Sequence, residues 1–337
     1  MNSIPKISAQ LDENKIFKII NKNFSKLAPT YYKMLSNWFI RAYGVYGDID
    51  KYIILIYLVN KDFIFFRKNG LIVEFETFFK DKSLEIEKIN ISDISKDLQI
   101  PKESVRRKVE ELEKKGVIKK TKKKIFISMN AFSPDRVNQG IKEVSTLLHE
   151  FNKLLKKENE INKTFEVKEI ITSIKKNYSF CWYQFYKFLF IFTNRWRKSV
   201  GDLETFCVGI VVMLNAVERQ SFRVKDLNIK QFQGSLSLAE LKDRGVNAMS
   251  LSEITGIPRP TVVRKLKYLI DNDYLSIDEK KLLEVNIKGK ALKISKDLQD
   301  KNILSISNFT YRVFNQIKII DLSRHSSGYG YGWRDNK

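Results

Sequence analysis

The side chains best suited to bind a ligand in this chain are basic ones that recur in two matching stretches. Residues 100–112 read Ile-Pro-Lys-Glu-Ser-Val-Arg-Arg-Lys-Val-Glu-Glu-Leu, and residues 257–269 read Ile-Pro-Arg-Pro-Thr-Val-Val-Arg-Lys-Leu-Lys-Tyr-Leu. The stretches lie 157 residues apart and agree at six of 13 positions. Each has the form of a turn that leads into a basic helix, which is how a helix-turn-helix meets DNA. The expected chemistry is therefore recognition of a polyanion.

Helical periodicity separates a buried face from an exposed face on each predicted helix. In the first helix, Val105, Val109 and Leu112 recur at i, i+4 and i+7, so we expect them to face the core. Basic and hydroxyl side chains are left for the outer face, and a turn containing lysines follows each helix. The residues predicted to contact DNA are Lys102, Ser104, Arg106, Arg107, Lys108, Lys122, Lys123, Lys124, Arg259, Thr261, Arg264, Lys265, Lys280 and Lys281.

The first basic helix has neighbours that would hold it against a groove of the duplex. Residues 94–98 are predicted to form a supporting helix, residues 99–101 a turn, and Lys102–Lys115 the recognition helix. Gly116 follows, as glycine does where a helix ends in the left-handed conformation. Residues 117–127 are predicted to form two short strands around a lysine-rich tip, which is typical of a wing.

The second copy repeats this order. Residues 251–255 are the supporting helix, 256–258 the turn and Arg259–Asp271 the recognition helix. Pro260 falls in the first turn of that helix, where the missing amide hydrogen costs little. The strands of the second wing are predicted at residues 274–277 and 282–285. Two complete units in one chain predict two DNA half-sites read by one molecule.

The repeat extends beyond these motifs. Residues 32–35 (Tyr-Lys-Met-Leu) match residues 186–189 (Tyr-Lys-Phe-Leu), and the pair Gly47-Asp48 matches Gly201-Asp202, all at an offset of 154 residues. Both aspartates are predicted to cap a following helix, because a short acceptor side chain satisfies free backbone amides there. Biased use of lysine and isoleucine could align by chance, but ordered matches at a nearly constant offset favour duplication of one unit.

The predicted fold is mainly α with small β wings: tandem duplicated winged helix-turn-helix domains linked by long helices. Residues 71–79 suit either a strand or a helix, and helices are expected at 136–157, 290–300 and 305–320. The predicted organisation is a polar N-terminal arm at 1–28, a first winged-helix unit at 29–160, a linker at 161–180, a second winged-helix unit at 181–321 and a disordered tail at 322–337.

Composition bounds the class of protein. In 337 residues, 61 Lys and Arg against 39 Asp and Glu give a net charge of +22, which favours a polyanionic partner, although codon bias also contributes lysine. The two cysteines, Cys181 and Cys207, lie in apolar segments of the sequence and are expected to be buried thiols. No apolar stretch is long enough and free enough of polar residues to span a bilayer, and no signal peptide is visible. We expect a cytoplasmic, bacterial, nucleoid-associated protein.

Catalysis is not expected. The chain shows no phosphate-binding glycine loop, no dinucleotide fingerprint, no nucleophile elbow and no histidine-rich metal signature. With two histidines in the whole chain, His149 and His325, acid–base catalysis by imidazole is poorly provided for. We therefore expect no enzyme, no cofactor and no metal ion.

The residues of the second copy resemble winged helix-turn-helix transcription regulators. Residues 254–262, Ile-Thr-Gly-Ile-Pro-Arg-Pro-Thr-Val, are similar to the sequence motif with which that family forms its supporting helix, turn and recognition helix. The order of the predicted elements is similar to that of the MarR class. Residues 285–292 are similar to the segment that follows the wing in that class. Neither wing carries the Asp-x-Arg tip of many members, and the first copy lacks the glycine after its wing. The resemblance implies a normally dimeric regulator fused into one chain, responsive to an effector that no residue identifies.

Three function classes stay open at this level. The first is a transcription regulator that acts as a single-chain pseudo-dimer on two half-sites of double-stranded DNA, without a membrane and as a monomer rather than a homodimer. The second is a tandem winged-helix replication initiator, which would bind iterated sites at an origin. The third is a protein-interaction scaffold without DNA binding, against which the retained Arg106, Arg107, Arg264 and Lys265 argue.

Overall fold

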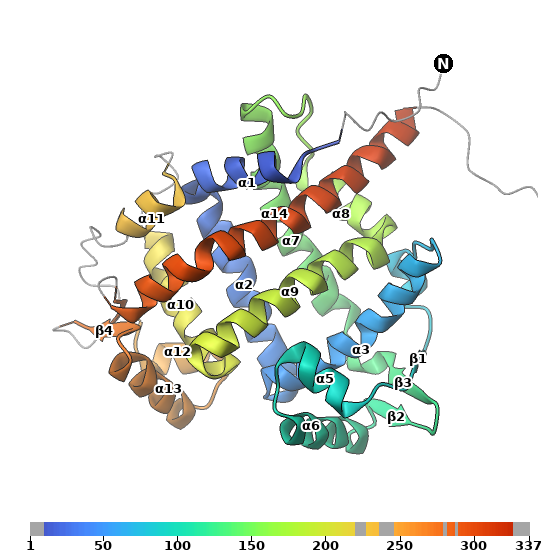
Figure 1. Cartoon of the computed structure of the whole chain (residues 1–337), viewed down its shortest axis with the longest axis horizontal. Helices are drawn as coiled ribbons and strands as arrows, with labels where there is room; N and C mark the ends of the chain where they lie inside the picture. The colour runs from blue at the N-terminus through green and yellow to red at the C-terminus, as the bar shows by residue number, and fades with distance from the viewer. Residues whose placement is uncertain (1–9, 220–226, 236–245, 279–281, 287–288, 326–337) are drawn as a thin grey trace, which may run out of the picture.

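The computed structural model describes residues 10–219, 227–235, 246–278, 282–286 and 289–325. They are mainly helical and include small antiparallel sheets (Figure 1). The first part comprises α1 (Glu13–Lys22), α2 (Phe24–Tyr46), α3 (Ile49–Lys68), α4 (Phe75–Phe78), β1 (Ser83–Glu87), α5 (Ile91–Leu98), α6 (Lys102–Lys114), β2 (Ile118–Lys120), β3 (Lys124–Ser128), η2 (Met129–Ala131) and α7 (Pro134–Lys157). The second comprises α8 (Val167–Lys176), α9 (Tyr178–Val200), α10 (Leu203–Arg219), α11 (Ile229–Ser235), α12 (Ala248–Thr255), α13 (Arg259–Asp271), β4 (Leu275–Ile277), β5 (Leu283–Val285) and α14 (Lys290–His325).

The helices of the two parts begin and end at corresponding residues. The bounds of α8 and α9 lie 154 residues after those of α1 and α2, and α10 begins 154 residues after α3. The bounds of α12, α13 and β4 lie 157 residues after those of α5, α6 and β2. These are the two offsets at which the sequence itself repeats, so the local signals that start and stop each helix recur with the repeat.

In each part of the chain a pair of antiparallel strands follows the basic helix. In the first, β2 and β3 pair antiparallel, and β1 adds to the other edge of β3 to give the order β1-β3-β2. Leu84 lies opposite Ile127 and Ile86 opposite Ile125, and all four side chains are buried. Alternate residues of a strand share one face, so these pairs form the inward side of the sheet. In the second part, β4 pairs antiparallel with β5.

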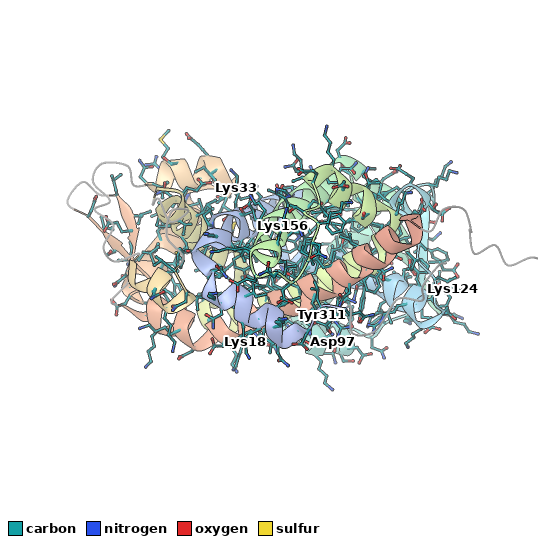
Figure 2. All side chains as sticks on the ribbon, turned by 90° about the horizontal axis from the view of Figure 1, so that it is seen from above. Lys18, Lys33, Asp97, Lys124, Lys156 and Tyr311 are labelled. Carbon is teal, nitrogen blue, oxygen red and sulfur yellow. The ribbon has the colours of Figure 1, made fainter. Side chains whose placement is uncertain are left out.

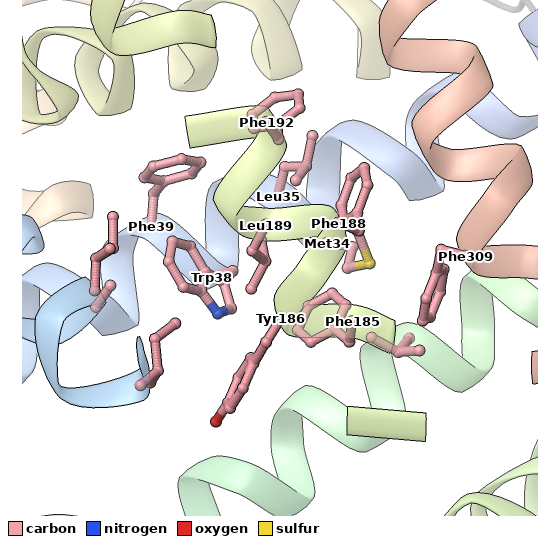
Figure 3. Close-up of a cluster of buried hydrophobic side chains, with 14 of the residues drawn as sticks. Met34, Leu35, Trp38, Phe39, Phe185, Tyr186, Phe188, Leu189, Phe192 and Phe309 are labelled. Atoms are coloured by element: carbon pink, nitrogen blue, oxygen red, sulfur yellow. The ribbon is translucent and has the colours of Figure 1, made fainter. Parts of the chain in front are cut away.

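Long helices of one part pack on helices of the other. Helix α2 packs on α10, and α9 packs on α3, so the same kind of contact occurs in both directions. Likewise α1 packs on α14 and α8 packs on α7. Aromatic rings fill the space between these helices. The centroid of the Phe39 ring lies 5.0 Å from that of Phe206 and 6.4 Å from that of Phe192. Figure 3 shows α2 and α9 contributing side chains to this one cluster.

The sequence missed two helices at the starts of the two parts. The N-terminal arm predicted for 1–28 is wrong for residues 13–28, because α1 buries Ile16, Ile19 and Ile20 and α2 begins at Phe24. The linker predicted for 161–180 contains α8, and α9 has begun by Tyr178. Both short helices read as polar segments, and it is their narrow apolar stripe, packed on a long helix, that stabilises them.

Other departures are smaller. The two helices expected after the second wing form one helix, α14, which continues to His325, four residues into the predicted tail. Residues 326–337 of that tail lie outside the described residues. The segment left open between strand and helix contains the short helix α4, and β1 follows it.

The predicted caps and buried thiols are confirmed. Asp48 Oδ1 accepts a hydrogen bond from the backbone amide of Lys51 at 3.0 Å, and Asp202 Oδ1 accepts one from Thr205 at 2.7 Å. Cys181 and Cys207 are buried free thiols, and burial raises the pKa of both. In the part of the chain that the structure describes, no single helix combines the length and apolarity needed to cross a membrane; α9 and α10 meet those criteria only as a pair bent by 95°.

Candidate nucleic-acid interface

The turns that lead into α6 and α13 are built alike. Before α6, the Ser95 hydroxyl donates to the carbonyl of Ile100 at 2.7 Å; before α13, the Ser252 hydroxyl donates to that of Ile257 at 2.7 Å. The left-handed residue that ends the supporting helix is Gln99 (φ 52°) in the first turn and Gly256 (φ 70°) in the second. In both turns an isoleucine and then a proline follow the left-handed residue, and the serine hydroxyl bonds to the carbonyl of that isoleucine.

We call α5, α6 and the β2–β3 hairpin the first head, and α12, α13 and the β4–β5 hairpin the second head. Figure 1 shows α6 and α13 along the same lower edge of the molecule. The inward face of α6 carries Val105, Val109 and Leu112, as predicted, and α13 buries Val262, Leu266 and Leu269 at matching positions. Each basic helix therefore lies on the protein with one face and presents the other to solvent.

Most of the predicted contact residues on these helices reach solvent. Lys102, Arg106 and Arg107 of α6 are exposed, as are Arg259 and Arg264 of α13. Ser104 and Thr261, which occupy equivalent places, are half-buried. These residues give each helix a basic outer surface, as the sequence predicted.

Lys108 and Lys265 are the exceptions, and the outward position predicted for Lys108 is wrong. Its side chain is 11% exposed, and its ammonium group pairs with the carboxylate of Asp48. Lys265 pairs in the same way with Asp202. Lys108 follows Val105 by three residues and precedes Leu112 by four, which places it on the inward stripe of the helix. The aspartates that cap the earlier helices α3 and α10 accept these ammonium groups and so offset the cost of burying each lysine.

Carboxylates within the first head engage several of its exposed cations. Arg106 pairs with Glu103, and Arg107 lies 3.9 Å from Glu111. Glu111 also accepts a hydrogen bond from Lys51, which lowers the pKa of this carboxyl group. Exposed pairs of this kind contribute little to stability, so a phosphate can displace the carboxylate at small cost.

The tip of the first hairpin is a lysine-bearing turn. The backbone amide of Thr121 donates to the carbonyl of Lys124 at 2.8 Å, and this bond closes the turn. Lys122 and Lys123 are exposed there and have no ion pair among the described residues. Lys124 pairs with Glu85 of the neighbouring strand, and Figure 2 shows it at one end of the molecule. The predicted contacts Lys280 and Lys281 of the second hairpin lie outside the described residues.

The second part of the chain also holds the first head in place, which the sequence did not reveal. Arg197 of α9 donates to the carbonyl of Leu98 at 2.7 Å and to Asp50 Oδ1 at 2.5 Å. Asn194 Nδ2 donates to the carbonyl of Asp97 at 2.8 Å. These bonds satisfy carbonyl groups at the C-terminal end of α5, where a helix has free acceptors. No local signal identifies Arg197, because its partners are about 100 and 147 residues away in the sequence.

In the described residues, no group of three or more His, Cys, Asp or Glu side chains is placed to hold a metal ion. A recess between α2, α7 and α9 is lined by aromatic rings and by Arg41. Arg136 also lines this recess, and the Arg41 guanidinium donates two of its N–H groups to the two oxygens of Glu143, at 2.7 and 2.6 Å.

Comparison with models of known protein families, with curated proteins and with solved structures found no match to this chain.

Proposed function

We propose that this chain is a DNA-binding transcription regulator with two winged helix-turn-helix units, which binds double-stranded DNA as a single-chain pseudo-dimer. The observation that carries the proposal is the pairing of α6 and α13: each follows the same serine-fixed turn, buries one apolar face and presents arginines on the other. A supporting helix precedes each, and a hairpin follows it. This is the arrangement with which winged helices enter a major groove.

The reciprocal packing of the long helices supports the pseudo-dimer. Because α2 packs on α10 while α9 packs on α3, the two parts contact one another as two subunits related by a two-fold axis would. Such a frame fixes the spacing of the two heads. We therefore propose two half-sites about 10–10.5 base pairs apart, one helical turn of DNA, on one side of the duplex.

The two half-sites are proposed to differ in sequence. Lys102, Glu103 and Arg106 of α6 correspond to Arg259, Pro260 and Val263 of α13, so the outer faces of the two helices offer different chemistry. An operator for this chain is thus an imperfect palindrome. The basic outer residues of both helices argue against a scaffold that has lost DNA binding.

The test is selection of bound duplexes from a random-sequence library, followed by footprinting of the selected sites. Two protected half-sites about one turn apart are expected with the full chain. A double variant Arg106→Ala/Arg107→Ala should lose protection of one half-site, and Arg264→Ala should weaken the other. The exposed Lys198→Ala on α9 is the matched control and should bind as the unchanged chain does. Absence of protection on any duplex, or protection of a single half-site, would refute the proposal.

Mapping of bound sites in the genome separates the regulator from the replication initiator. Sites at promoters support regulation. Iterated sites at an origin of replication would replace the regulator by the initiator, while leaving the pseudo-dimer and its DNA-binding faces unchanged.

A further inference from the structure

At two equivalent positions on the outer faces of α6 and α13, a polar side chain of the first helix is replaced by one that carries methyl groups. Ser104 and Arg106 on the first helix are replaced by Thr261 and Val263 on the second. Val263 is 50% exposed, so nothing in the described protein covers much of this side chain. Each replacement puts a methyl-bearing group where the first helix has a purely polar one.

Elsewhere on the second head, too, exposed apolar side chains replace polar or charged residues of the first head. The second head's exposed large apolar side chains stand where the first head has polar or charged residues, because the offset of 157 residues aligns them one by one. The pairs are Met249 with Ser92, Ile254 with Asp97, Val263 with Arg106, Tyr268 with Glu111, and Ile277 with Lys120. The second head therefore has a less charged outer surface than the first.

The surroundings of Val263 favour DNA over a protein as its partner. The exposed Arg259 lies one turn before Val263 on α13, and the exposed Arg264 directly follows it. Neither arginine has a carboxylate partner among the described residues. Two unpaired positive charges beside an exposed apolar side chain suit a partner that offers phosphates and an apolar group together.

The major groove offers one such apolar group. Thymine presents its C5-methyl group there, and valine or threonine methyl groups contact it, whereas arginine pairs with the O6 and N7 acceptors of guanine. A valine in place of an arginine therefore changes the base that the helix selects.

We propose that Val263, with Thr261, contacts thymine methyl groups, so that the half-site under α13 contains thymine where the half-site under α6 contains guanine facing Arg106. This inference rests on the proposed function and deepens it, because it assigns a base to a residue of each head. Arg259 and Arg264 position the helix on the phosphates, and Val263 and Thr261 select the base.

Replacement of thymine by deoxyuridine tests the inference, because it removes the C5-methyl group and keeps base pairing. The probe is a duplex recovered from the random-sequence selection, with each thymine of the α13 half-site replaced in turn by deoxyuridine. We expect affinity to fall about threefold to fivefold for each contacted methyl group, the effect of burying one such group. The same replacement in the α6 half-site should have little effect.

Variants assign the effect to the residue. At the thymine that Val263 contacts, Val263→Ala should bind the thymine and deoxyuridine duplexes with affinities within about twofold of one another, whereas a thymine that Thr261 contacts should keep its effect. Arg106→Ala should instead relax the guanine preference of the other half-site and leave the deoxyuridine effect intact. Leu304→Ala, at a similarly exposed apolar residue of α14, is the matched control. Alanine suits a helix, so Val263→Ala is expected to fold, which circular dichroism checks.

The outcomes separate the inference from the proposed function. Failure to bind any duplex overturns both. Binding to two half-sites with equal affinity for thymine and deoxyuridine overturns the inference alone, as does a selected α13 half-site without thymine. If Val263→Ala changes the mass of the particle in light scattering but not the deoxyuridine effect, the exposed valine serves a protein contact and the inference is likewise overturned.

Discussion

Lys108 of α6 donates to Asp48, the aspartate that caps the N-terminus of α3 with its other carboxylate oxygen. One side chain thus starts a core helix and anchors the basic helix to it. Lys265 and Asp202 repeat the arrangement between α13 and α10. A lysine that the sequence suggests as a phosphate contact is therefore a structural residue that ties α6 to the start of α3.

Breaking this pair should destabilise the fold. Lys108→Met keeps the aliphatic stem but leaves the half-buried Asp48 without its partner, and we expect the free energy of unfolding to fall by about 1–3 kcal/mol. A double-mutant cycle with Asp48→Asn, followed by urea unfolding, should give a coupling of about 1–2 kcal/mol. The exposed Lys114→Met serves as the control. Additive effects of the two substitutions would show that the contact contributes nothing.

The equivalent pair in the second head should couple more weakly. The Asp202 side chain is 42% exposed, against 21% for Asp48, so water screens its attraction to Lys265 more strongly. A coupling in the Lys265→Met and Asp202→Asn cycle that equals or exceeds that of the first pair would contradict this ranking.

The first hairpin should supply much of the salt-dependent affinity for DNA. Lys122→Ala/Lys123→Ala removes two cations that have no ion pair among the described residues, so the slope of log affinity against log salt should flatten by up to about 2. Lys124→Ala should do less, because Glu85 already neutralises Lys124. Lys18→Ala/Lys168→Ala, at exposed lysines of α1 and α8, removes the same charge elsewhere. Equal slopes for the two double variants would refute the assignment.

Arg197 should be the side chain whose loss most weakens the link between α9 and the first head. Its side chain is 9% exposed, and Arg197→Ala leaves Asp50 and the carbonyl of Leu98 without their donor. We expect a loss of about 2–4 kcal/mol in urea unfolding, and a smaller one for Arg197→Lys, which cannot donate in two directions from a planar fork. Lys198→Ala, at the exposed neighbour, should change stability by less than about 0.5 kcal/mol.

Asp62 should make stability depend on pH between about 4 and 7. Burial raises the pKa of this carboxyl group on α3 from 3.8 to about 7. Between these values the folded protein keeps a proton that the unfolded chain has lost, so stability falls as pH rises through this window. Asp62→Asn should remove that decline and stabilise the protein above pH 7, by about 1–2 kcal/mol after allowance for screening by solvent. Asp135→Asn, at an exposed aspartate, is the control in thermal unfolding from pH 4 to 8. A decline that persists in Asp62→Asn would assign it to another group.

The chain should be a monomer of 39.6 kDa in light scattering at low micromolar concentration. The aromatic surfaces of α2 and α9, which two-chain regulators would use between subunits, are already buried within the chain around Phe39. An obligate dimer at the same concentration would show that a further surface mediates association.

The sequence by itself determined much of the local structure of both heads, although the supporting helices α5 and α12 each begin three residues earlier than predicted. Helix α13 begins and ends at the predicted residues, and α6 begins at Lys102 as predicted, because the signals for these boundaries are local. A proline near the start, an apolar stripe along the helix and a glycine or asparagine after its end act within a few residues. The paired hairpin strands follow for the same reason.

The tertiary structure alone decided which partners the buried charges find and what holds the heads. The spacing of Lys108 places it on the inward stripe of α6, but its acceptor Asp48 lies 60 residues away in the sequence and beside it only in the fold. Helices α1 and α8 form because α14 and α7, from the other part of the chain, cover their isoleucine-rich faces. The position of Arg197 likewise depends on partners in another part. Such contacts join segments far apart in the chain, so no local spacing records them, and burial makes their loss costly.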